Sequence, residues 1–224
     1  FAPAAITFGG VTMSKWENVS MSVIRRMPRY YRFLTHLKQI GTTRISSKEL
    51  SEIMGLTASQ IRQDLNCFGG FGQQGYGYMV EQLQHEIGNI LGISNAYKAI
   101  LIGAGNLGQA LALNMPFGSL GFDLIGLFDN APEKIGTKVG DLPVYDVREL
   151  EDFCAREHPV MAIFCVPREA VETLSDTLYH QNVKSFWNFS HFDITMKYPD
   201  AMVENVHLND SLMTLCYRIS NGSD

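Results

Sequence analysis

Three glycines at the spacing G-x-G-x-x-G give the strongest chemical signal in the sequence. Gly103, Gly105 and Gly108 lie between an apolar run and a second run that is typical of a helix. The first glycine permits a tight turn, the second lets a pyrophosphate approach the backbone, and the third lets a helix pack close to a strand. Free N–H groups at the helix N-terminus then favour the phosphates. The pattern predicts a dinucleotide site, and the alternative it leaves open is a purely structural glycine turn.

The sequence also indicates which dinucleotide is bound. Asp129 ends the apolar run 122–128 and lies 21 residues after Gly108. A carboxylate at this place accepts hydrogen bonds from ribose hydroxyls and repels a 2′-phosphate, so we expect NADH and NAD⁺ as cofactors instead of their phosphorylated forms. The predicted cofactor-binding residues are Gly103, Ala104, Gly105, Asn106, Leu107, Gly108, Asp129 and Pro167.

A second group of polar side chains follows helix-turn-helix spacing. Residues 46–49 and 57–60 each start with Ser or Thr and end with Glu or Gln, which is a capping-box pattern, and Gly55 marks a turn between the two helices. On the second helix, Arg suits the acceptors of guanine and Gln suits the donor–acceptor pair of adenine. At the start of the first helix, Ser and Lys suit a phosphate. The predicted DNA-binding residues are Ser46, Ser47, Lys48, Ser59, Gln60, Arg62, Gln63, Gly75 and Tyr76, and the alternative is an ordinary solvated face.

The charge distribution agrees with DNA binding by one part of the chain. The net charge is −5, but residues 18–80 hold eight basic and three acidic side chains and residues 81–224 carry −10. A basic head on an acidic body indicates that only the head meets a polyanion. We predict no catalytic residue: His191 is the best candidate, but no Lys, Asp or Glu accompanies it in the pattern. A small NAD-dependent oxidoreductase remains the alternative function.

Periodicity and turn residues predict an α/β protein with an N-terminal winged helix-turn-helix and a C-terminal Rossmann-like, doubly wound parallel sheet. The head has helices at 28–40, 48–54, 58–68 and from residue 80, with a β-hairpin wing within 69–80 and a linker at 92–95. The body has strands at 98–102, 122–128, 143–145, 160–166, 185–189 and 202–206, and helices at 107–115, 147–156, 168–181 and 210–220.

These elements predict four segments. Residues 1–17 are expected to be a non-native, disordered leader, 18–94 the DNA-binding domain, 95–207 the NAD(H)-binding domain and 208–224 a dimerisation helix. The pattern of that last helix alone fits packing on its own domain or on a partner subunit. Four scattered cysteines without metal-ligand spacing predict reduced, mostly buried thiols, no metal site and a cytoplasmic protein. No apolar run is long enough to span a membrane.

The order of these motifs resembles the Rex family of bacterial redox-sensing repressors over residues 21–220. The resemblance implies a homodimer on a palindromic DNA operator, a C-terminal helix exchanged between subunits, and release of DNA by NADH. The segments that carry it are 28–34 (PRYYRFL), 44–50 (RISSKEL), 57–62 (TASQIR), 72–78 (GQQGYGY), 103–111, 133–136 (EKIG) and 188–189 (NF).

The chain departs from the family pattern at three places. Gln73 and Gln74 replace basic wing residues, and Gln63 replaces a cation of the recognition helix, so we expect weaker and less salt-dependent DNA binding. The resemblance also implies a switch in which a Tyr and an Asp engage each other or the Arg that matches Arg32. Asn114 and His207 occupy those two positions. They cannot form the Asp–Arg ion pair, which predicts a blunted or pH-sensitive response as the alternative to an intact switch.

Overall fold

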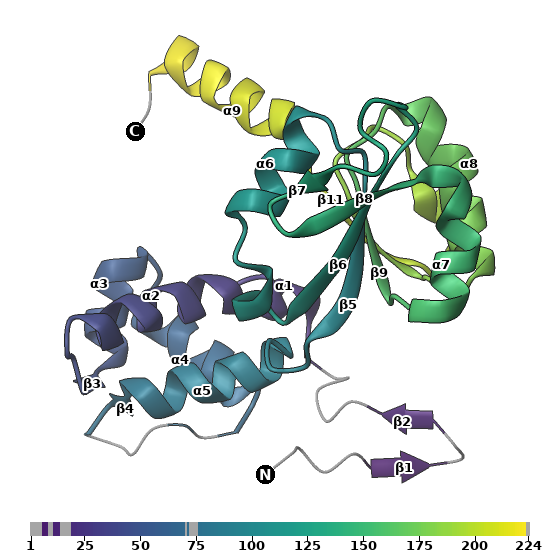
Figure 1. The fold of residues 1–224 in the computed structure, drawn as a ribbon. Helices are drawn as coiled ribbons and strands as arrows, with labels where there is room; N and C mark the ends of the chain where they lie inside the picture. Colours follow the sequence, from purple (N-terminus) through teal and green to yellow (C-terminus); the bar gives the residue numbers. More distant parts are fainter. Residues whose placement is uncertain (1–5, 9–10, 14–18, 70, 72–75, 223–224) are drawn as a thin grey trace. The chain divides into compact units, whose positions relative to one another are not determined.

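The computed structural model describes residues 6–8, 11–13, 19–69, 71 and 76–222 of the 224-residue chain. The chain divides into two compact units, residues 1–92, here called the head, and residues 93–224, here called the body (Figure 1). In the segment that we set apart as a leader, strands β1 (Ile6–Phe8) and β2 (Val11–Met13) pair antiparallel.

Helices of the head surround one apolar core. Tyr30 and Leu34, one turn apart on one helix, are fully buried, and Leu50, Ile61 and Ile87 reach the same core from other helices. Gly55, at φ +62°, ends one helix in the left-handed conformation and begins the turn to the next, which confirms the helix-turn-helix order. The helices are α1 (Met21–Ile24), α2 (Met27–Gln39), α3 (Ser47–Met54), α4 (Ala58–Asn66) and α5 (Val80–Leu91).

The two predicted capping boxes have different outcomes. At α3 both halves form: the Ser46 hydroxyl accepts the N–H of Glu49 at 3.1 Å, and the Glu49 carboxylate accepts the N–H of Ser46 at 2.8 Å. At α4 the Thr57 hydroxyl accepts the N–H of Gln60 at 3.1 Å, but the Gln60 amide turns to Asp64. The reciprocal half of the second prediction, in which the Gln60 amide oxygen accepts from the N–H of Thr57, is therefore wrong, because the amide is instead drawn to the charged carboxylate of Asp64 as its donor.

Only part of the predicted wing lies within the described residues. There, strand β4 (Tyr78–Met79) pairs antiparallel with β3 (Arg44–Ile45), before α3, a pairing that the sequence did not predict. The buried side chains of Ile45 and Tyr78 are directly opposite each other, so this pairing closes the edge of the core. The predicted DNA-binding residue Gly75 lies outside the described residues.

The body is a doubly wound sheet. Its strands β5 (Tyr97–Ile102), β6 (Phe122–Asp129), β7 (Lys138–Val139), β8 (Leu142–Asp146), β9 (Met161–Phe164), β10 (Ser185–Asn188) and β11 (Met202–Asn205) lie in the order β11-β10-β9-β5-β6-β8-β7. Every described pair is parallel except β7 with β8. Because β5 lies between β6 and β9, the carboxyl ends of these three strands form the topological switch point where such sheets bind ligands.

Helices cover both faces of the sheet (Figure 1). Ile100 and Ile102 of β5 pack toward α7 and α8, while Ala99 and Leu101, which alternate with them, pack toward α6. The helical elements are α6 (Asn106–Asn114), η1 (Phe117–Leu120), η2 (Val147–Glu149), α7 (Leu150–Glu157), α8 (Arg168–His180), η3 (Ile194–Met196) and α9 (Leu208–Asn221). The last helix, α9, extends away from the sheet, and each of its residues is exposed.

Candidate functional sites

The glycine loop between β5 and α6 assigns different roles to its three glycines. A side chain on Gly103 would meet the backbone oxygen of Cys165 at 2.6 Å, and one on Gly108 would meet the backbone oxygen of Gly103 at 1.9 Å. Gly105 is different, because nothing lies within 4 Å of the place where its Cβ would be. The outer glycines therefore serve close packing, and the middle one leaves open space at the N-terminus of α6.

Asp129 is fixed at the carboxyl end of β6. Its two oxygens accept the N–H of Ala104 at 2.8 Å, the N–H of Ala131 at 2.9 Å and the ammonium of Lys134 at 3.1 Å. Burial opposes ionisation of Asp129, but these hydrogen bonds outweigh it and lower the pKa of the carboxyl. The group is thus an ionised acceptor, and the N–H of Ala104 is already engaged by it.

A pocket of about 430 Å³ lies at the switch point of the sheet. It brings together the predicted residues Gly103, Gly105, Asp129 and Pro167, whereas Ala104, Asn106, Leu107 and Gly108 are not among its lining. The remaining lining residues are Ile102, Phe128, Asn130, Lys134, Val147, Cys165, Val166, Ala170, Thr173 and Leu174. A mostly apolar lining with a few polar groups is typical of a site for a small organic ligand.

Sequence reasoning missed Lys134 as part of this site. It lies five residues beyond Asp129, within the Glu133–Gly136 motif, and its ammonium reaches the same carboxylate oxygen as the N–H of Ala104. The motif was the only feature of the sequence that drew attention to Lys134, but it did not indicate that the side chain points into the pocket. The pocket therefore holds a cation beside Asp129, the acid that the sequence predicts to select the cofactor.

The predicted DNA-binding side chains gather on one side of the head. Arg62 of α4 donates to the hydroxyl of Ser47, at the N-terminus of α3, over 3.1 Å. Ser59, Gln63 and Lys48 are exposed, so α4 and the start of α3 form one polar surface. Tyr76, which is 68% exposed, lies beside the guanidinium of Arg44 at 5.9 Å from the ring centre. This arrangement adds Arg44, which the sequence reasoning had not selected, to the basic surface.

Ser46, a predicted DNA-binding residue, is constrained by the capping box that the sequence predicted. Its hydroxyl and its N–H are both engaged with Glu49, so the carboxylate occupies the first turn of α3. The hydrogen bonds with Ser46 lower the pKa of Glu49. A phosphate at this helix end would meet that negative charge, and Ser47 and Lys48 are better placed to receive it.

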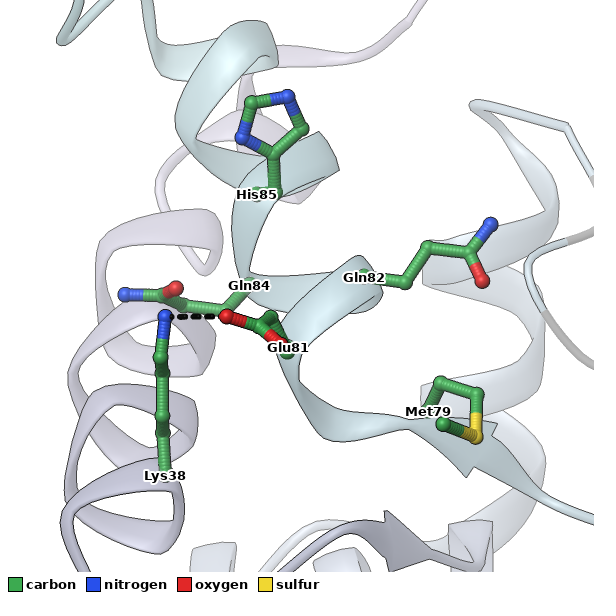
Figure 2. Close-up of a pocket in the computed structure, with 6 residues that line it drawn as sticks. All are labelled: Lys38, Met79, Glu81, Gln82, Gln84 and His85. Atoms are coloured by element: carbon green, nitrogen blue, oxygen red, sulfur yellow. Dashed lines mark ion pairs between the residues drawn. The ribbon is translucent and has the colours of Figure 1, made fainter.

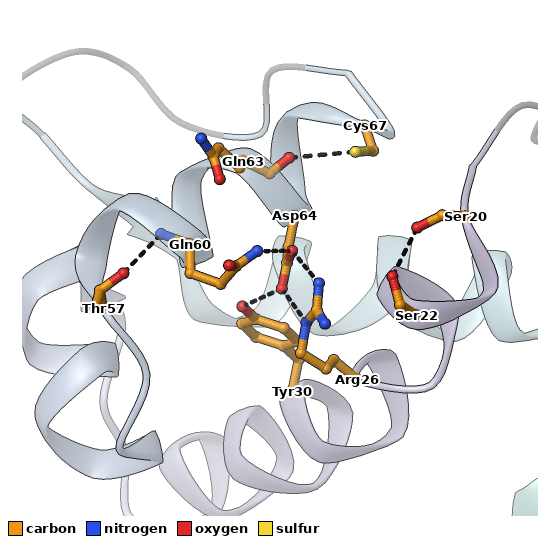
Figure 3. Close-up of polar contacts among 9 residues, drawn as sticks. All are labelled: Ser20, Ser22, Arg26, Tyr30, Thr57, Gln60, Gln63, Asp64 and Cys67. Atoms are coloured by element: carbon orange, nitrogen blue, oxygen red, sulfur yellow. Dashed lines mark hydrogen bonds and ion pairs between the residues drawn. The ribbon is translucent and has the colours of Figure 1, made fainter.

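Behind the polar surface, an ion pair between the half-buried Arg26 and the buried Asp64 joins the start of α2 to α4 (Figure 3). Asp64, only 1% exposed, accepts two hydrogen bonds of 2.7 Å from Arg26 and one of 3.1 Å from Tyr30. The Gln60 amide donates to the same carboxylate at 2.8 Å. Burial raises the pKa of Asp64, but the hydrogen bonds from Arg26, Gln60 and Tyr30 outweigh it and the pKa is lowered. Asp64 is therefore an ionised group whose donors come from two helices.

A second hollow in the head, of about 370 Å³, has a different character (Figure 2). None of its lining residues belongs to α3 or α4. Its cation, Lys38, is paired with Glu81 at 2.8 Å, so the hollow does not extend the basic surface. It is lined by Lys38, Met79, Glu81, Gln82, Gln84 and His85.

The three predicted switch residues have partners within their own units. Arg32 is exposed on α2, with its guanidinium 5.8 Å from the ring of Phe33. The amide of Asn114 donates to the backbone oxygen of Ala110 at 2.8 Å. His207 stacks on His191 with ring centres 5.2 Å apart and lies 3.5 Å from Asp210.

The described residues add two findings on other chemistry. Cys154 is buried and Cys165 half-buried, and burial raises their thiol pKa values to about 11 and about 12, whereas Cys67 and Cys216 are exposed. The prediction of mostly buried thiols is thus wrong for two of four, because both lie on exposed helix ends or faces. Within the described ranges, no group of three or more His, Cys, Asp or Glu is arranged to hold a metal, and no helix is long and apolar enough to cross a bilayer.

Comparison with protein families matches both units. Residues 18–66 match the family described as putative DNA-binding protein N-terminus, and residues 94–192 match the CoA binding domain family. The first match covers the helix-turn-helix, and the second covers the glycine loop and the strands that line the pocket.

Individual relatives match nearly the whole chain. The redox-sensing transcriptional repressor Rex of Thermoanaerobacter pseudethanolicus is 52% identical over 93% of this chain and 92% of its own length. The protein of that name from Clostridium botulinum is 49% identical over 91% and 96%. The crystal structure of RSP in complex with β-NAD⁺ and operator DNA is 52% identical, with a TM-score of 0.85 over 90% of this chain and 92% of that chain. RSP in complex with β-NADH is 48% identical, with a TM-score of 0.82 over 90% and 94%.

Proposed function

The chain belongs to the Rex family of redox-sensing transcriptional repressors. We propose that it represses transcription by binding a palindromic operator, and that binding of NADH causes it to release this DNA. The observation that carries the proposal is the presence of two separate sites on one chain. The pocket with the open Gly105 and the ionised Asp129 suits NADH and NAD⁺. The surface formed by α4 and the start of α3 suits the major groove and its phosphates.

The release of DNA follows from linkage between the two sites. NADH weakens operator binding only if it binds the DNA-incompetent state more tightly than the DNA-competent state. RSP, a relative about half identical to this chain, has been crystallised with NAD⁺ and operator DNA together and with NADH. This pairing supports NAD⁺ as the cofactor of the DNA-bound state.

We propose a homodimer in which α9 packs on a second copy of the chain. Leu212, Leu215 and Ile219 repeat at helical spacing and are 65%, 50% and 74% exposed. A helix with an exposed apolar face gains stability by covering it, and a palindromic operator requires two heads. Exchange of α9 between subunits would cover the apolar face of the helix and would also join two heads in one dimer.

The relatives are named as repressors, and the chain is a regulator instead of an enzyme. His191, the candidate for proton transfer, stacks on His207 and does not line the nucleotide pocket. Because operator DNA is its partner, we place the protein in the cytoplasm.

The test is an affinity measurement on a palindromic duplex that the chain itself selects from a random-sequence pool. The Kd for that duplex is measured at fixed salt without cofactor, with saturating NADH and with saturating NAD⁺. We expect NADH to raise the Kd at least about tenfold, equivalent to about 1.4 kcal/mol of coupling, and NAD⁺ to leave it unchanged. Equal Kd values in all three conditions would overturn the sensing proposal and leave a DNA-binding protein with NAD as a structural ligand.

A further inference from the structure

The way Gln60 is held by Asp64 bears on what Gln60 can read on DNA. An ionised carboxylate accepts hydrogen bonds but donates none. The side-chain amide of Gln60 must therefore turn its nitrogen toward Asp64, and the distance of 2.8 Å joins Nε2 to Oδ1. Figure 3 shows the amide oxygen pointing away from the carboxylate. The charge of Asp64 thus decides which end of the amide faces away from the carboxylate.

The carboxylate of Asp64 is itself fixed by other hydrogen bonds. Its other oxygen, Oδ2, accepts from Arg26 Nε and Tyr30 Oη, and Arg26 Nη2 donates to Oδ1. These donors come from α2 and its N-cap, so the carboxylate is anchored on an element other than the one it orients. Turning the Gln60 amide over would place its oxygen against a buried carboxylate, which is repulsive.

Gln60 lies in the first turn of α4, which is where the recognition helix of a helix-turn-helix meets base edges. In the major groove, the groups that donate to an acceptor are the exocyclic amino groups of adenine and cytosine. We propose that Asp64 is a positioning residue that makes Gln60 an acceptor on the DNA surface, and that Gln60 Oε1 accepts from a base amino group in each half-site. The inference rests on the proposed function, and it replaces the paired donor–acceptor contact with adenine expected from the sequence.

The experiment is a double-substitution cycle between protein and DNA, using the self-selected duplex. At each adenine or cytosine of one half-site, the base is replaced in turn by purine or 2-pyrimidinone, which lack the amino group. Wild-type protein should lose about 5- to 10-fold in affinity at one position, which is the usual value of one hydrogen bond. In the Gln60→Ala variant, removal of the amino group at that position should cause no further loss of affinity. In the control variant Gln63→Ala, which changes an exposed residue of the same helix, removal of the amino group should still cause the wild-type loss.

A second set of DNA duplexes carries 7-deazaadenine, which lacks the N7 acceptor. We expect no change that depends on Gln60. A loss with 7-deazaadenine that Gln60→Ala removes would overturn the proposal in favour of donation by the amide nitrogen. Absence of a Gln60-dependent loss at every amino position would also overturn it, while NADH-dependent release measured on the same protein would leave the proposed function standing.

Two further variants separate positioning from stability. Tyr30→Phe removes one donor of Asp64 but leaves the Gln60 contact, so it should lower the melting temperature and keep the amino-group dependence. Asp64→Asn offers Gln60 an N–H donor and lets the amide turn over, so the amino-group dependence should disappear. If Asp64→Asn does not fold, the comparison of amino-group removal with 7-deazaadenine in wild type and Gln60→Ala still decides which end of the Gln60 amide contacts the base. An unchanged amino-group dependence in folded Asp64→Asn would refute the role of Asp64.

Discussion

Replacing Gly105 by valine should separate cofactor binding from folding. The backbone at Gly105 has φ −79° and ψ −171°, an extended conformation that valine adopts readily, and no atom lies within 4 Å of the added Cβ. The substitution should therefore leave the free energy of unfolding within about 1 kcal/mol of wild type. Its two methyl groups would fill the space that the pyrophosphate needs beside the N-terminus of α6.

The loss of cofactor affinity can be estimated from the hydrogen bonds that the displaced phosphates give up. A hydrogen bond to a charged group contributes about 1.5–3 kcal/mol. Loss of two such bonds costs about 3–6 kcal/mol, so the Kd for NADH should rise at least about 100-fold. DNA affinity without cofactor should be unchanged, because Gly105 belongs to the body and the predicted DNA-binding residues belong to the head.

The assay is a fluorescence titration with NADH, combined with thermal unfolding of each variant. Gly118→Val is the matched control, since Gly118 also has open space at its Cβ position but does not line the pocket. The control should bind NADH as wild type does. NADH affinity within threefold of wild type in Gly105→Val would refute the placement of the pyrophosphate.

Three other predictions follow from the same geometry. Arg62→Ala should cost about 1–3 kcal/mol of operator binding and relax base preference at one position; a uniform loss on all duplexes would make Arg62 a phosphate contact. Asp129→Ser removes the charge that repels a 2′-phosphate and frees Lys134, so NADPH affinity should rise about tenfold and fall again when Lys134→Ala is added. Because the pKa of Asp64 is lowered in the folded head, its stabilisation is present above pH of about 4, near the unfolded value, and is lost as pH falls through the folded value. In urea unfolding measured from pH 2 to 6, the free energy of unfolding of Asp64→Asn should therefore fall less steeply with decreasing pH than that of wild type.

The order of helices and strands could be predicted from the sequence because the signals are local. Apolar runs separated by helical segments predict β5, β6 and β9. The capping box that starts at Ser46 and the turn residue Gly55 predict the two ends of α3. Contacts between distant residues could not be predicted in this way. Asp64 and Arg26 are 38 positions apart, and neither residue type indicates the other. The sequence predicted that the Gln60 amide caps α4 together with Thr57, because that pattern is local. It did not indicate that the carboxylate of Asp64 would bind the amide instead.

The nucleotide pocket shows the same division. Its glycines and Asp129 could be predicted because tight turns and ribose recognition require those residue types. Lys134 could not, because a lysine after a strand is usually solvated, and only the fold brings its ammonium to 3.1 Å from Asp129. The pairing of β3 with β4 could not be predicted for a similar reason, because it depends on the burial of Ile45 opposite Tyr78, and Ile45 lies outside residues 69–80.

The residues at the switch positions determine how NADH coupling must be tested. His207, at the N-cap of α9, lies 3.5 Å from Asp210 in the first turn of that helix, and it cannot supply the carboxylate that an ion pair with Arg32 would need. Linkage requires a difference in NADH affinity between two states, and it does not require that particular ion pair. We therefore expect Arg32→Ala to keep the ratio of operator Kd values with and without NADH within twofold of wild type. The ratio is the appropriate readout because any phosphate binding by the Arg32 guanidinium affects both Kd values equally and cancels. A ratio that falls to one in Arg32→Ala would show that this guanidinium carries the coupling through a partner other than a carboxylate at position 207.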